Sequence, residues 1–160
     1  MEILQKQYTL LQASREEVFN FLETQVGKDL HTPVPGYDNR TIRYLLEHTA
    51  GCYFNWMAHF ALKQPVQVFD DHDFATVNLI RRVYGRVDDI MVVFLENFKD
   101  DIEVPIQGLH SNNDKVNATP LQLFTHVLTH EFHHKGQIMS MCRLLGYTPP
   151  DTDVSLFFNW

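Results

Sequence analysis

Apolar residues recur at helical spacing in four long stretches of the chain. The first stretch runs from about Leu4 to Thr24, and its apolar positions include Tyr8, Leu11, Val18 and Leu22. Residues three and four apart share one face of a helix, so this spacing predicts an amphipathic helix. The segment "SREE" at 14–17 resembles a capping box, and a helix that begins at Ser14 is the alternative. Because the apolar spacing continues on both sides of Ser14, we predict one continuous helix.

Two further helices follow the same pattern. The second is predicted from about Arg40 to Lys63, after a loop that contains two prolines and a glycine, with Asp38 and Asn39 as candidate caps. It ends before a proline, which cannot continue a helix. The third is predicted from about Phe74 to Phe98, with Asp73 as its candidate cap.

The fourth helix has the clearest start and end. Thr119 is placed as the N-cap, Pro120 as the first helical residue and Gln122 as the partner in a capping box. The helix is predicted to reach Leu145, and Gly146 supplies the left-handed stop before two prolines.

Little else in the chain predicts regular structure. Residues 102–117 alternate weakly around "SNND" at 111–114, which favours a short hairpin or an irregular loop. Four long amphipathic segments with almost no strand pattern predict an all-α four-helix bundle, with residues 1–160 as a single domain. The apolar tail 154–160 is expected to pack on this bundle; an active-site wall and a dimer interface are the alternatives.

Composition narrows the classes of protein. The 160 residues are 44% hydrophobic and 21% charged, which is typical of a globular domain. The net charge is −7 and the basic residues are scattered, which argues against a nucleic-acid partner. The chain shows no apolar run long enough for a bilayer and no secretion-signal pattern at its start, so we expect a cytoplasmic protein without a membrane partner. In that compartment Cys52 and Cys142 are expected to be buried free thiols.

Histidine is concentrated in the fourth predicted helix, at positions 126, 130, 133 and 134. His130 and His134 are four residues apart and therefore lie one above the other, where both can bind one metal ion. With Glu131 they match H-E-x-x-H, the signature of zinc peptidases. A peptidase also needs a third histidine or carboxylate ligand downstream, and only Asp151 and Asp153 follow, beyond a proline break. The sequence therefore argues against a peptidase.

A better third ligand lies upstream, at His48 in the second predicted helix. If the second and fourth helices run antiparallel, His48 and His134 lie about 12 and 16 Å from the same end of the bundle. Three imidazoles could then converge. His126 is one turn further back and His133 points about 100° away from His134, so neither is expected to join them. Cys52 lies one turn after His48 and could approach the ion, although a buried structural thiol is the preferred interpretation.

Two segments together resemble a known family. "RTIRYLLEHTAGCYFNW" and "HVLTHEFHHKGQIMSMCRLLGYTPPDTD" are similar to the DinB/YfiT-like superfamily of metal-dependent bundle proteins. The family motif pairs a histidine in the second helix, here His48, with H-x3-H-x-G-Q in the fourth, here His130, His134, Gly136 and Gln137. The resemblance implies an up-down-down-up bundle and frequently a homodimer. It also implies a divalent metal ion on the three histidines, with zinc or nickel expected first and iron as a further option.

Three neutral imidazoles would leave the ion its full charge and an open position. Some members of the family are thiol-dependent transferases, so the leading hypothesis is an enzyme that transfers or activates a low-molecular-weight thiol. One alternative is a hydrolase that uses metal-bound hydroxide, with Glu131 as the catalytic general base. Another is a non-catalytic, stress-linked metal- or ligand-binding protein. Glu131 could equally support a ligand or be a solvated helix charge, and close helix packing would explain Gly136.

Overall fold

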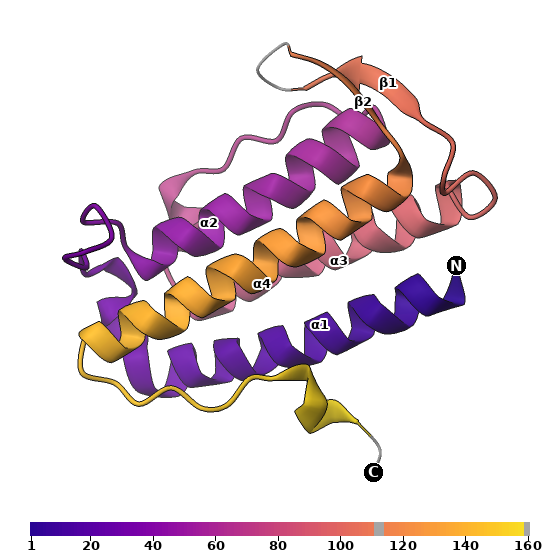
Figure 1. Cartoon of the computed structure of the whole chain (residues 1–160). Helices are drawn as coiled ribbons and strands as arrows, with labels where there is room; N and C mark the ends of the chain where they lie inside the picture. Colours follow the sequence, from indigo (N-terminus) through magenta and orange to yellow (C-terminus); the bar gives the residue numbers. More distant parts are fainter. Residues whose placement is uncertain (111–113, 159–160) are drawn as a thin grey trace.

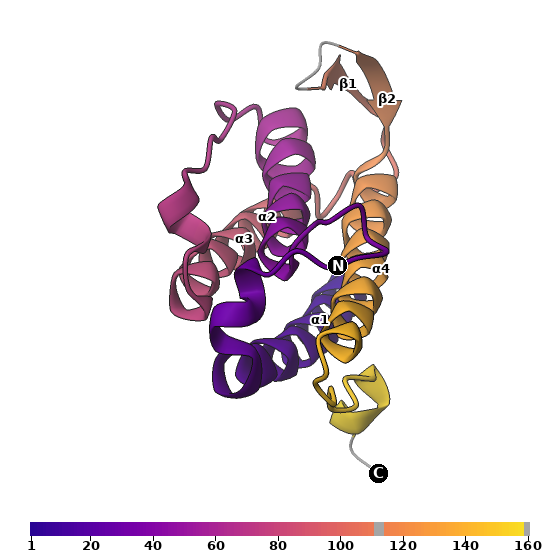
Figure 2. The same cartoon turned by 90° about the vertical axis from the view of Figure 1, so that its left-hand side faces the viewer.

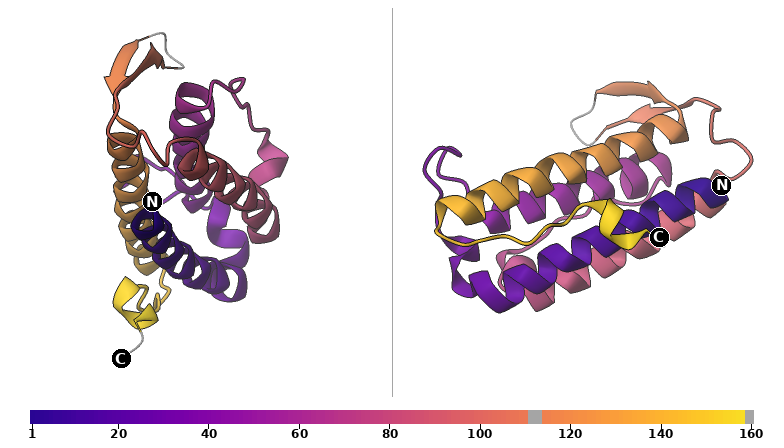
Figure 3. Two further views of the ribbon diagram at one scale, coloured as in Figure 1. Left: turned by 90° about the vertical axis from the view of Figure 1, so that its right-hand side faces the viewer. Right: turned by 60° about the horizontal axis from the view of Figure 1, so that its bottom comes forward.

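The computed structural model describes residues 1–110 and 114–158 and contains four long helices (Figure 1). They are α1 (Glu2–Phe21), α2 (Ile42–Tyr53), α3 (Val77–Asn97) and α4 (Pro120–Leu144). Helices α1 and α4 run in one direction along the bundle, and α2 and α3 run in the other (Figures 1 and 3). The chain therefore forms the predicted all-α, up-down-down-up bundle. Within the described ranges no helix is long and apolar enough to cross a bilayer.

Threonine hydroxyls cap three of these helices. The side chains of Thr41, Thr76 and Thr119 each accept a hydrogen bond from the backbone N–H three residues later. At α4 the capping box is complete, because the Gln122 side chain accepts from the backbone N–H of Thr119 at 2.9 Å. The predicted start of α4 is confirmed, and so is its end, where Gly146 has a φ of +92°.

The caps predicted for α2 and α3 were wrong. Asp38 and Asn39 adopt left-handed conformations in a turn before Thr41, with φ of 52° and 56°. Asp73 belongs to a separate 3₁₀ turn at Asp71–Phe74, where it forms a capping box with Asp70. Short polar residues favour both turns and helix caps, so composition alone did not separate the two roles.

Helices α1 and α2 both continue beyond their α-helical parts. Ser14 is buried within α1, which excludes a helix start there, and a π-helical turn at Leu22–Val26 prolongs α1. Helix α2 continues as a π-helix over Phe54–Ala61. The predicted extents of the two helices were therefore close, but the change of helical pitch was not foreseen.

Two long connections cover parts of the bundle: a crossover between α2 and α3 and a hairpin between α3 and α4. Residues 62–76 travel back along the bundle so that α3 can run parallel to α2 (Figure 2). Strands β1 (Ile106–Leu109) and β2 (Lys115–Ala118) form an antiparallel hairpin near the start of α4 (Figures 1 and 3). Of the two alternatives predicted here, a short hairpin and an irregular loop, the structure has the hairpin. Residues 111–113 of its turn lie outside the described residues.

The core lies between the four helices, and each helix contributes its apolar face. Fully buried large side chains from successive elements include Leu11, Leu22, Leu45, Tyr53, Phe60, Ile80, Phe94 and Phe124. The segment before the tail is held on the bundle, since the carbonyl of Thr152 accepts hydrogen bonds from Ser14 Oγ and Lys135 Nζ, both at 2.7 Å. The tail lies against α1 through its 3₁₀ turn at Val154–Phe157, although Leu156 and Phe158 stay exposed. Its last two residues, 159 and 160, are outside the described part.

Candidate metal centre

Helices α2 and α4 pack side by side and antiparallel, and this brings three histidines together (Figure 1). His48 comes from α2, and His130 and His134 come from successive turns of α4. The ring centroids are 4.9 Å apart for His48 and His130, 4.8 Å for His48 and His134, and 4.4 Å for His130 and His134. One nitrogen from each ring lies within 4.8 Å of the other two, so the group could hold a metal ion.

Hydrogen bonding leaves nitrogen lone pairs in this group available. The Nδ1–H of His134 donates to Gln137 Oε1 at 2.7 Å, because an amide oxygen can only accept. In the neutral ring, the Nε2 of His134 is then unprotonated and has a free lone pair. His130 Nε2 is buried and has no hydrogen-bond partner among the residues that the structure describes. A buried polar atom without a partner is uncommon and points to an absent ion or water.

Burial, helped by neighbouring charges, favours the neutral, ligating form of the three rings. Desolvation, together with the smaller effects of the neighbouring His134 and His48, lowers the pKa of His130 to about 4. Desolvation also lowers the pKa of His48 and of His134. Metal ligation requires unprotonated imidazole, so near neutral pH all three rings are in the form that a metal ion needs. The donor set, its spacing and its unpaired buried nitrogen therefore fit a divalent ion.

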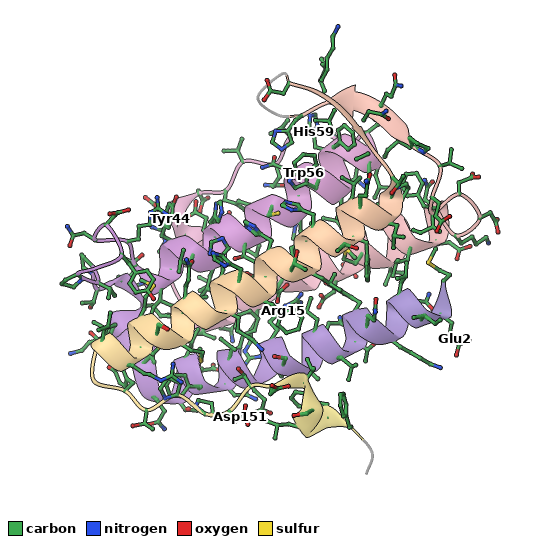
Figure 4. The ribbon with its side chains drawn as sticks, viewed as in Figure 1. Glu2, Arg15, Tyr44, Trp56, His59 and Asp151 are labelled. Atoms are coloured by element: carbon green, nitrogen blue, oxygen red, sulfur yellow. The ribbon has the colours of Figure 1, made fainter. Side chains whose placement is uncertain are left out.

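Two of these histidines, His48 and His130, open onto a cavity of about 440 Å³ between α2, α4, the crossover segment and the hairpin, whereas His134 does not line it. Its lining residues are Tyr44, Glu47, His48, Gly51, Cys52, Asn55, Trp56, Gln67, Phe69, His110, His126 and His130. Figure 4 shows Tyr44 and Trp56 along α2 and its continuation. Tyr44 stacks on His48, with the ring planes 5° apart, and Trp56 packs against His110 and His126. The cavity thus joins the candidate metal ligands to an aromatic wall.

Two cavity residues stand closer to this centre than the sequence predicted. Cys52 Sγ lies 3.5 Å from His126 Nε2, and both residues line the cavity. Burial raises the pKa of the Cys52 thiol to about 12, so without a metal ion it is protonated. The π-helix begins directly after this turn of α2, and it carries Asn55 and Trp56 into the cavity wall. π-Helical segments often occur at functional sites.

Glu131 occupies a different place from the one expected of a catalytic base. Its side chain is only 6% exposed and accepts hydrogen bonds from Arg15 Nε at 2.7 Å, Arg15 Nη2 at 3.0 Å and the Tyr53 hydroxyl at 2.6 Å. Arg15 reaches this position from α1 (Figure 4). The solvated-charge interpretation is wrong, because the carboxylate is buried. Both oxygens are bound inside the bundle, and Glu131 is absent from the residues that line the cavity.

His133 was predicted to stay apart from the three rings, and it does not line the cavity. His133 is exposed, and His59 lies outside the cavity, where its Nδ1–H donates to the Gln64 carbonyl. Two cavity residues, His110 and Phe69, were not predicted at the site. His110 lies at the hairpin and Phe69 on the crossover segment. Nothing in their local sequence indicates a cavity. Only the path of these connections over α2 brings them there.

Comparison with known proteins shows the family of this chain. The model of the DinB family matches residues 2–160. The chain belongs to the DinB family. It is also similar to "Protein DinB" of Bacillus subtilis (strain 168), with 22% identity over 151 residues, covering 90% of this chain and 87% of that protein.

Gly136 of the family motif is not explained by close packing. It is exposed on α4, and a Cβ atom added there would meet nothing within 4 Å. The packing expected from the sequence is therefore wrong. Because glycine costs a helix about 0.5–1 kcal/mol relative to alanine, Gly136→Ala is expected to raise the unfolding free energy by about that amount. Urea denaturation of both proteins would measure this, and a destabilised variant would contradict the open space seen here.

Proposed function

We propose that this DinB-family chain binds one divalent metal ion through His48, His130 and His134 and uses it to activate a low-molecular-weight thiol. The observation that carries the proposal is the buried His130 Nε2, which has no hydrogen-bond partner in the described part of the chain. It belongs to a group of neutral imidazoles, two of which line a cavity. Zinc and nickel are the ions proposed first, since both accept imidazole ligands.

The residues of the cavity have distinct tasks in this proposal. When bound, the ion would act as a Lewis acid that favours the thiolate form of the thiol. His48, His130 and His134 hold it, and Gln137 fixes the orientation of the His134 ring through the Nδ1 hydrogen bond. Desolvation lowers the pKa of His126, which keeps this ring neutral and able to accept a proton. Tyr44, Trp56 and Phe69 provide an apolar surface for the electrophile.

The position of Glu131 favours thiol activation over hydrolysis. A hydrolase of the H-E-x-x-H kind uses this glutamate as the base, but here the carboxylate is bound to Arg15 and Tyr53. Attack by a thiol needs no such carboxylate, because the thiol is far more acidic than water. The alternative is a metal-binding protein without catalytic activity, and an activity assay would distinguish the two. We also propose that the protein is a homodimer.

The experiment is a thiol-consumption assay with metal-loaded protein. Glutathione, bacillithiol and mycothiol would each be tested with a panel of electrophiles, using wild type, His48→Ala and the control His72→Ala. His72 is an exposed histidine outside the cavity. We expect turnover in wild type and in the control, and background consumption in His48→Ala. No conjugation by protein of verified metal content would contradict the thiol proposal while leaving the metal site intact.

A further inference from the structure

A second group of candidate ligands lies beside the three histidines. It consists of Cys52 from α2 with His126 and His130 from α4, and the ligand atoms of the three residues lie within 4.8 Å of one another. All three line the same cavity, so an ion could reach them. His130 belongs to both groups, whereas Cys52 and His126 belong to the second alone.

The distance between the sulfur and the nitrogen suits a tetrahedral ion. Zinc bonds of about 2.3 Å to sulfur and 2.0–2.1 Å to nitrogen, at a tetrahedral angle, place the two ligand atoms about 3.6 Å apart. Cys52 Sγ and His126 Nε2 are 3.5 Å apart. A thiol-to-imidazole hydrogen bond would give a similar separation, but it would not require a third ligand. Here the His130 ring stands 5.5 Å from that of His126, on the adjacent turn of α4.

We propose that Cys52, His126 and His130 form a second metal position that takes thiophilic ions such as Cd²⁺ or Cu⁺. Thiolate ligands select soft ions, whereas a set of imidazoles also suits nickel; zinc accepts both kinds of ligand. On binding, the S–H bond of Cys52 breaks, a bond between sulfur and the ion forms, and the proton leaves to solvent. A neutral imidazole has one lone pair to give, so His130 serves one group at a time. The two positions are therefore alternatives, and one chain holds one ion.

Cadmium binding to the full-length, metal-free protein tests this proposal. We expect one equivalent of Cd²⁺ and a thiolate-to-cadmium charge-transfer absorption in the near ultraviolet. Cys52→Ser should abolish the absorption and weaken cadmium binding at least about tenfold, and His126→Ala should also weaken binding. Cys142→Ser is the matched control, since Cys142 is likewise buried and free but lies outside the cavity, and it should behave as wild type.

His48→Ala separates this proposal from that of the three-histidine centre. The variant lacks one member of the first group and none of the second, so it should keep its cadmium absorption and lose its nickel. Cadmium bound without a charge-transfer band would overturn the proposal, as would a band that persists in Cys52→Ser. If Cys52→Ser does not fold, cadmium binding by His126→Ala decides, because unchanged affinity there contradicts the second position.

Discussion

Replacing His48 with alanine is expected to remove the metal ion from the protein. His48 is the ligand that α2 contributes to the three-histidine group, and without it only His130 and His134 from α4 are left. Two imidazoles on one helix cannot enclose an ion from both sides. We therefore expect affinity for nickel to fall at least about 100-fold, which corresponds to about 2.7 kcal/mol. Elemental analysis of tag-free protein and competition with a chelator would measure the loss.

A graded series makes this test specific. Gln137→Leu removes the hydrogen bond that orients His134, and losing such a partner typically weakens metal binding about 10–100-fold. His72→Ala should change nothing. Metal retained at full affinity in His48→Ala would mean that the third ligand is another residue. Absence of metal from wild type, even after reconstitution, would leave the histidines with a purely structural role.

Arg15→Met is expected to cause the largest loss of stability. The Arg15 side chain is 6% exposed and binds both oxygens of Glu131, and its Nη1 donates to Asp88 Oδ1 at 2.6 Å. Desolvation alone would lower the pKa of Arg15, but Glu131, Tyr8 and Tyr53 together outweigh it and raise that pKa, with Glu131 contributing most. Methionine keeps much of the volume and removes the charge, so Glu131 stays buried without its cation. Breaking a buried pair in this way costs about 3–5 kcal/mol.

Urea denaturation at neutral pH would measure the change in unfolding free energy. Lys6→Ala is the control, because Lys6 and Glu2 form an exposed ion pair, for which a change of no more than about 0.5–1 kcal/mol is expected. The double variant Arg15→Met with Glu131→Leu should lose less than the sum of the single variants, since it leaves no unpaired carboxylate at position 131. An Arg15→Met protein as stable as wild type would show that the buried pair is not needed.

The sequence by itself determined the helices and the three histidines. Helical periodicity depends on residues three and four apart, and a capping box depends on residues within one turn, so the start of α4 at Thr119 could be predicted from local sequence. His130 and His134 share a face for the same local reason. The addition of His48 came from the antiparallel arrangement expected of α2 and α4, and from the family motif.

Only the tertiary structure decided what surrounds these histidines. Glu131 and Arg15 are 116 residues apart, and no local pattern indicates that the carboxylate next to a candidate metal ligand turns into the core toward α1. The π-helix after Tyr53 and the approach of Cys52 to His126 likewise depend on how α2 packs against α4. Side-chain periodicity specifies which face of a helix is buried. Which residues this face contacts depends on the neighbouring helices. Those contacts join residues far apart in the sequence, so they are determined only when the chain folds.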